Sequence, residues 1–171
     1  MQIPAREIVN FIEKKKGVNV DQTLAFVQNK GIKILTYEDS KYPYMLRQIS
    51  NPPMTLFYKG DLFSCNLERT VAFVGSRRAS FNGKEGVNSI IADLRGTDLT
   101  VVSGLAAGID ATAHRSAIDN NLKTIGVIAS GFDYVFASVE KVDNKYLFVL
   151  LVSISFGWCN GTCYAVPCTS C

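Results

Sequence analysis

Short apolar runs alternate with helical patterns in the middle of the chain. Runs of mostly β-branched or apolar residues occupy Thr70–Val74, Leu99–Ser103 and Lys123–Ala129, and each is followed or ended by small residues. Such continuous runs predict strands that are covered on both faces. Helical patterns lie between them, over about 83–94 and 109–120. The alternation predicts an α/β fold with a Rossmann-like parallel sheet and right-handed crossovers.

The first 31 residues predict a small helical module. An amphipathic pattern over residues 4–16 ends at Gly17, and Asp21 can cap a second helix that runs to Asn29 and stops at Gly31. Helical pairs of this kind are found in DNA-binding modules and, more often, as plain packing units.

The rest of the chain divides by composition. Residues 32–69 are expected to be a connector with one strand, Met54–Tyr58, after an extended Pro52–Pro53 pair. Residues 70–145 are expected to form the Rossmann-like domain, and residues 146–171 a tail without any charged residue.

Composition indicates an ordinary globular protein of 171 residues, 47% hydrophobic and 19% charged. The start lacks the basic-then-apolar pattern of a signal peptide, and the longest uncharged apolar run, Tyr146–Trp158, has 13 residues, whereas a membrane span needs about 20. We therefore expect a cytoplasmic protein with no membrane partner.

Charge alone does not identify a partner. The net charge is +3, and residues 1–60 hold nine basic against five acidic residues. The run Lys14–Lys16 fits a solvated helix face or a binding patch.

The turn after the first predicted strand is a candidate anion site. Gly75 and Ser76 can offer backbone N–H groups and a hydroxyl to a phosphate, and Arg77 can grip it in bidentate fashion. The turn is neither a Walker loop nor a Gly-x-Gly-x-x-Gly dinucleotide fingerprint, so no cofactor is predicted. The competing interpretation is a bare strand-to-helix turn with exposed arginines.

The turn after the second predicted strand offers a second set of small residues. Ser103, Gly104 and Ala106 precede a helix on which Asp110 and His114 share a face. A hydrolytic Ser103–Asp110–His114 triad is one hypothesis, although a Gly-x-Ser-x-Gly elbow is absent. The favoured interpretation is that Asp110 lies near the positive helix start and pairs with His114 to hold loop to helix.

The tail concentrates four of the five cysteines within its last 13 residues. They could form a four-thiolate zinc site, or the tail could be a plain hydrophobic segment. We favour a third interpretation, in which the tail is the product of a shifted reading frame or a premature end, so no metal is predicted. The four residues are Cys159, Cys163, Cys168 and Cys171.

Several motifs together resemble one family. They occur in order between about residues 40 and 135, and they are Tyr42–Pro43, Pro52–Pro53, Val71–Arg77, Ser103–Asp110 with Ala113–His114, and Thr124–Asp133. Each motif is weak, but the set resembles the DNA-processing protein A family (DprA, also called Smf). The resemblance implies an extended Rossmann-type domain behind a small helical module.

The resemblance also implies a function. Family members bind single-stranded DNA, help to load the RecA recombinase on it, and serve DNA uptake in natural transformation; they are not known as enzymes. The phosphate-gripping residues of the family fall on Gly75, Ser76, Arg77, Ser103, Gly104 and Ala106.

The chain departs from the family pattern near its end. Phe136–Ala137 stands where the family has Tyr-Pro, so the resemblance does not support a basic DNA contact in this region, such as Lys141. The Arg-Asn-Arg segment and the strand–helix units that follow in the family are absent. Family members are expected to dimerise through that later part, so the sequence gives no basis for a dimer here. The alternatives are a nucleotide- or sugar-phosphate-processing enzyme of Rossmann type, or an inert truncated fragment.

Overall fold

The structure of the chain is a computed structural model that describes residues 20–128 and 147–152. It divides into two compact units, Met1–Lys33 and Ile34–Cys171. The predicted helix over residues 4–16, the Phe136–Ala137 departure with Lys141, and the four tail cysteines lie outside the described residues. Within the described ranges, no helix is long and apolar enough to cross a membrane.

Helix α2 (Val20–Asn29) of the first unit confirms the predicted helix that runs to Asn29. The helix begins at Val20, so Asp21 lies in its first turn, and its predicted role as the cap is wrong. Gly31 has a φ of +63°, a left-handed conformation that glycine adopts without strain. The Gly31 and Ile32 N–H groups donate to the carbonyls of Gln28 (3.0 Å) and Val27 (2.9 Å). This pair of bonds is a Schellman motif, so the prediction that Gly31 ends the helix is confirmed.

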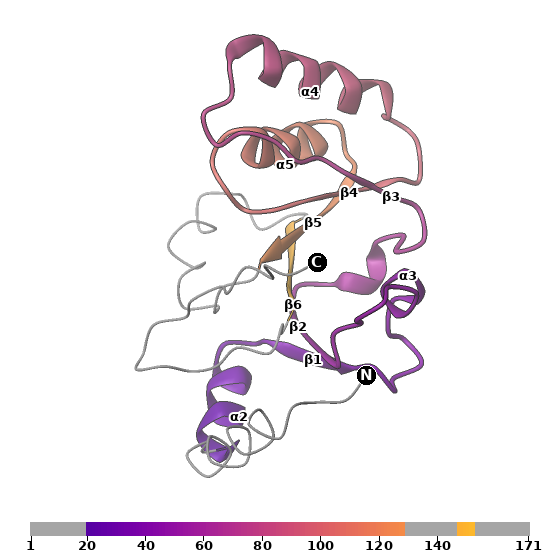
Figure 1. Ribbon diagram of the computed structural model, residues 1–171, viewed down its shortest axis with the longest axis vertical. Helices are drawn as coiled ribbons and strands as arrows, with labels where there is room; N and C mark the ends of the chain where they lie inside the picture. Colours follow the sequence, from indigo (N-terminus) through magenta and orange to yellow (C-terminus); the bar gives the residue numbers. More distant parts are fainter. Residues whose placement is uncertain (1–19, 129–146, 153–171) are drawn as a thin grey trace. The chain divides into compact units, whose positions relative to one another are not determined.

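The second unit is built around one sheet of six strands in the order β1-β2-β6-β5-β4-β3 (Figure 1). Strands β3, β4, β5 and β6 are parallel neighbours, and β2 pairs antiparallel with β6. The strands are β1 (Lys33–Thr36), β2 (Thr55–Lys59), β3 (Thr70–Ala72), β4 (Thr100–Ser103), β5 (Lys123–Ile128) and β6 (Leu147–Val152).

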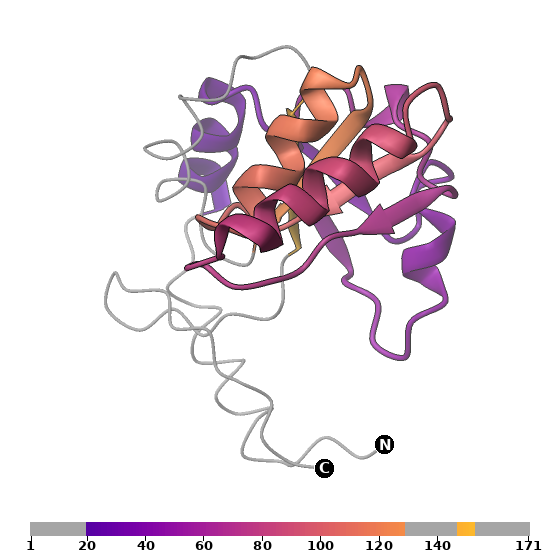
Figure 2. The ribbon, with the colours of Figure 1, turned by 90° about the horizontal axis from the view of Figure 1, so that it is seen from above.

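Two longer helices connect the parallel strands. Helix α4 (Phe81–Asp93) follows β3, and α5 (Ile109–Asp119) follows β4. They lie side by side over one face of β3, β4 and β5 (Figures 1 and 2). Two short helical turns, α3 (Tyr44–Arg47) and η1 (Leu62–Ser64), flank β2 along the chain.

These elements confirm the predicted α/β class. The three apolar runs are β3, β4 and β5, and the helical patterns between them are α4 and α5. Two features were missed: the expected connector also holds β1 and α3, and the expected tail contains β6. Because β6 lies between β2 and β5, the sheet runs across the expected boundaries at residues 69 and 145.

Hydrophobic side chains cover both faces of the central strands. On the α4–α5 side, Val101 of β4 packs in a cluster with Ile91 of α4 and Ala113 of α5. Val102, the next residue of β4, packs against a second cluster that includes Leu56 and Ile125. Successive strand residues point to opposite faces, so β4 is covered on both sides, as is typical of a parallel strand.

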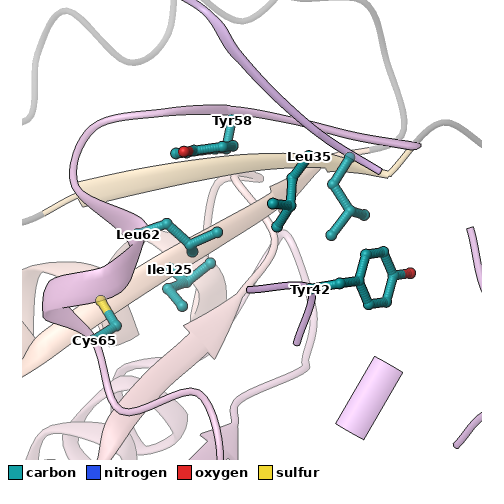
Figure 3. Packing of buried hydrophobic residues seen from close by; sticks show 7 residues of the cluster. Leu35, Tyr42, Tyr58, Leu62, Cys65 and Ile125 are labelled. Carbon is teal, nitrogen blue, oxygen red and sulfur yellow. The ribbon is translucent and has the colours of Figure 1, made fainter. Parts of the chain in front are cut away.

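The second cluster joins the first strands and their loops to β5. Figure 3 shows Leu35 of β1, Tyr58 of β2, Leu62 of η1 and Ile125 of β5 converging on one region. Tyr42, in the loop before α3, also belongs to this cluster, and its hydroxyl donates to the Pro53 carbonyl at 2.7 Å. This packing places the segment expected as a connector within the main core.

Candidate functional site

Two loops lie at the carboxyl edge of the parallel strands. The first joins β3 to α4 through residues 73–80, and the second joins β4 to α5 through residues 104–108. Since β3 and β4 run parallel, both loops leave the sheet at the same edge, where open α/β sheets bind their ligands.

The first loop presents its basic side chains to solvent. Gly75, Ser76, Arg77 and Arg78 are all exposed, and neither guanidinium has an ion-pair partner in the part of the chain that the structure describes. The Arg78 N–H donates to Ser76 Oγ at 3.1 Å, which fixes a tight turn. The two arginines therefore project from a hydrogen-bonded turn.

Ser80 connects this loop to α4. It is the N-cap of the helix, and its Oγ accepts from the Gly83 N–H at 3.2 Å. No acidic residue lies in the first turn of α4, and Lys84 is exposed there. The positive end of the helix dipole therefore reinforces the positive charge of the loop.

The start of α5 braces the first loop from behind. The Ile109 N–H donates to the Ser76 carbonyl at 3.2 Å. Gly75 packs so closely on Ile109 that a Cβ at Gly75 would lie 2.5 Å from Ile109 Cγ1. Gly108, with a φ of +87°, faces the carbonyl oxygens of Ser76 and Arg77, and a Cβ there would lie 2.6 Å from the Arg77 oxygen. The structure thus brings the two predicted loops together.

The second loop directs its polar groups inward. Ser103 is buried, and its Oγ donates to the Phe73 carbonyl at 2.7 Å. The Ala106 N–H donates to Asp110 Oδ2 at 3.3 Å, and a Cβ at Gly104 would lie 2.6 Å from the same oxygen. The Ser103 hydroxyl and the Ala106 N–H therefore donate to groups of the protein itself, and the Asp110 carboxylate places a negative charge beside the second loop.

His114 ties the second loop to the sheet. Its Nε2 lies 2.7 Å from the Gly104 carbonyl oxygen, and its Nδ1 lies 2.7 Å from Thr124 Oγ1. A carbonyl can only accept, so Nε2 carries a proton. The Thr124 hydroxyl also lies 3.0 Å from the Val101 carbonyl oxygen, and its single proton serves either that oxygen or His114 Nδ1. Burial lowers the pKa of His114, opposed by the Gly104 bond and the Asp110 charge.

These contacts correct two hypotheses. The Ser103–Asp110–His114 triad is not assembled, because the Ser103 hydroxyl and both His114 nitrogens are bonded elsewhere. The expected pairing of His114 with Asp110 is also wrong: each holds the loop separately, His114 at Gly104 and Asp110 at Ala106.

Sequence reasoning missed Gly108 and Thr124. A glycine directly before a helix can signal positive φ, and Gly108 has it. Thr124 sits inside a strand, and nothing in its neighbourhood along the chain indicates that it meets a histidine. For metals, no cluster of ligating side chains occurs among the described residues.

Comparison with known proteins agrees with this architecture. A family model described as DNA recombination-mediator protein A matches residues 33–147. The DNA processing protein DprA of Bacillus subtilis is 35% identical over 135 residues, which are 79% of this chain and 45% of that protein.

Solved structures give the same result. The X-ray structure of DprA from Streptococcus pneumoniae matches with a TM-score of 0.66 and 34% identity over 82% of this chain and 50% of that one. DNA processing protein A of Helicobacter pylori, whose structure concerns a single-stranded DNA binding mode of that protein, matches in fold with a TM-score of 0.54 and 22% identity, over 70% of this chain and 55% of that one.

The chain thus spans about half the length of these relatives. The family model covers more than half of the chain, including every strand from β1 to β5 and both loops of the candidate site. The chain therefore belongs to the DNA recombination-mediator protein A family, that of DprA and Smf.

Proposed function

We propose that this chain binds single-stranded DNA without sequence preference, as part of DNA processing and recombination. The observation that carries the proposal is the exposed Arg77–Arg78 loop, which packs on the start of α5 and is hydrogen-bonded to it. The family and the Helicobacter pylori relative, whose single-stranded DNA binding has been examined structurally, support the same ligand.

The chemistry of the first loop suits a phosphate backbone. A guanidinium binds phosphate oxygens in bidentate fashion, and backbone N–H groups add donors that ignore base identity. Between Thr70 and Lys84 the chain has three basic residues and no acidic one. Contacts of this kind fix a strand in place while reading none of its sequence.

The six candidate residues divide into two roles in this proposal. Gly75, Ser76 and Arg77 face the phosphate. Ser103, Gly104 and Ala106 shape the second loop, since the Ser103 hydroxyl and the Ala106 N–H are bonded within the fold and the Gly104 carbonyl accepts from His114. A phosphate is favoured at the first loop, because Asp110 would repel an anion at the second.

The wider role extends the proposal to partners. We propose further that a strand bound at this edge is passed to a RecA-type recombinase during natural transformation. The enzymatic alternative is not favoured, because the relatives are DNA-processing proteins and no acidic side chain lies in the first loop. A general base needs a carboxylate that can reach the substrate proton.

The test replaces one arginine at each end of α4. Arg77→Ala removes a charge from the loop before the helix, and Arg95→Ala removes the same charge from an exposed position just after its end. Fluorescence anisotropy is measured with oligo(dT) and a mixed-sequence oligonucleotide at several salt concentrations.

We expect Arg77→Ala to weaken binding to both oligonucleotides equally, by about tenfold. The slope of log affinity against log salt concentration should become shallower by about 0.7, the value for one phosphate contact on a single strand. Arg95→Ala should leave both unchanged. If Arg77→Ala binds like the unmodified protein at every salt concentration, the first loop is not the phosphate site.

A further inference from the structure

A large aromatic side chain stands exposed beside the arginine loop. Phe81, the first residue of α4, is 76% exposed, and Val74, at the other end of the loop, is 88% exposed. Phe73, one residue before Val74, is by contrast buried in the core. An exposed large apolar residue is informative because burial is its ordinary state.

The packing of α4 does not account for this phenylalanine. The helix buries Val87 and Ile91, which are one turn apart and contact the core of the sheet. At about 100° per residue, Phe81 points about 120° away from Val87 and about 80° away from Ile91. It therefore lies off the packed face, and the fold gains no core contact from its ring.

The charged residues near Phe81 indicate which kind of ligand could bind beside its ring. Arg77, Arg78 and Lys84 are exposed on either side of it. The next acidic residue along the chain is Glu85, one turn further along α4, whose Oε1 accepts from the Asn88 side-chain amide at 3.1 Å. Three positive charges thus outnumber one negative charge around Phe81. The surface therefore combines positive charge with an apolar aromatic face. A single nucleic-acid strand offers the matching alternation of phosphates and planar bases.

We infer that Phe81 stacks against a nucleobase of the strand whose phosphate Arg77 holds. Four residue steps separate the two residues, so their Cα atoms lie within about 14 Å, close enough for neighbouring parts of one strand. Stacking on an aromatic ring tolerates every base, which agrees with binding that has no sequence preference. The inference rests on the proposed function and adds an aromatic contact to it.

The experiment separates base contacts from phosphate contacts. Anisotropy is measured with a dT 20-mer and with an abasic 20-mer that carries the same phosphates. The variants are Phe81→Leu, Phe81→Trp and Arg77→Ala, and the matched control is Tyr44→Leu, which removes another exposed aromatic ring, at 60% exposure, from α3.

We expect Phe81→Leu to lose at least about fivefold in affinity for dT and nothing for the abasic strand. Phe81→Trp should keep dT binding, and Tyr44→Leu should change neither. Arg77→Ala should lose affinity for both strands, because it acts on the phosphates.

Two results would overturn the inference and are distinguishable. If Arg77→Ala weakens binding while Phe81→Leu binds dT like the unmodified protein, the phosphate site is supported and the stacking contact is refuted. If the unmodified protein binds neither strand, the proposed function falls and the stacking contact falls with it.

Discussion

Gly108 is the position at which the two loops depend most directly on each other, and Gly108→Ala tests that dependence. Its φ of +87° is a conformation that costs a non-glycine residue of order 1–3 kcal/mol. The new Cβ would also lie 2.6 Å from the Arg77 carbonyl oxygen and against that of Ser76. Both neighbours are backbone atoms, so they can yield only if the first loop moves.

The two effects add to a substantial loss. Overlap with atoms that cannot move aside costs about 1–3 kcal/mol, so we expect Gly108→Ala to lower the free energy of unfolding by about 2–6 kcal/mol. Small domains have about 5–15 kcal/mol in total. Displacement of Ser76 and Arg77 should also weaken oligonucleotide binding, even where the chain relaxes enough to recover part of the stability.

Gly86→Ala is the matched control. Gly86 lies inside α4, and a Cβ there would meet nothing within 4 Å. The substitution should raise the free energy of unfolding by about 0.5–1 kcal/mol, since alanine is the better helix former. Urea unfolding followed by circular dichroism measures both variants. If Gly108→Ala matches the unmodified protein in stability and in affinity, the proposed coupling between the loops is refuted.

Three further outcomes follow from buried groups. Burial lowers the pKa of His114 below 6.5, so the unfolded chain binds more protons as the pH falls below that value, and the free energy of unfolding should decrease from pH 7 to pH 5. Urea titrations should show a shallower decrease for His114→Gln, and equal slopes would contradict the assignment. Tyr42→Phe leaves the Pro53 carbonyl without its 2.7 Å donor and should lower the free energy of unfolding by about 1 kcal/mol; an unchanged urea midpoint would show that the bond contributes nothing. Burial raises the pKa of the Cys65 thiol to about 11, so iodoacetamide at pH 8 should modify it in urea but not in the native protein, as read by peptide mass spectrometry, and rapid native labelling would show that the site is open.

The core of the fold was predictable because its elements are local patterns. The apolar, β-branched residues of β4 alone predict a buried strand, and side-chain clusters cover both of its faces in the structure. β6 was not predictable in the same way, since its apolar run Leu147–Val152 is compatible with a tail, and it joins the sheet by pairing with Leu56–Lys59 of β2, about ninety residues earlier. Pairing across such a separation leaves no mark in the neighbouring sequence.

The positions of the two loops of the candidate site were predictable, but the direction of their polar groups was not. Small residues after β3 and β4 locate the loops, because parallel strands bring their carboxyl ends to one edge. Residue types alone show that Ser103 and Ala106 carry donors, but the acceptors of those donors are Phe73, thirty residues earlier, and Asp110 on the following helix. Only the folded chain shows that both donors point inward.

This inward bonding explains why the two loops are not equivalent. The second loop uses its donors, the Asp110 carboxylate and the His114 ring to fix the start of α5, and that start in turn holds Ser76 through the Ile109 N–H. The first loop then exposes Arg77 and Arg78 on a backbone that is hydrogen-bonded within its own turn and to the start of α5. A phosphate that binds there meets groups already in place, so less ordering is needed on binding. The path of a bound strand should therefore follow the first loop toward Phe81, away from the negative charge at Asp110.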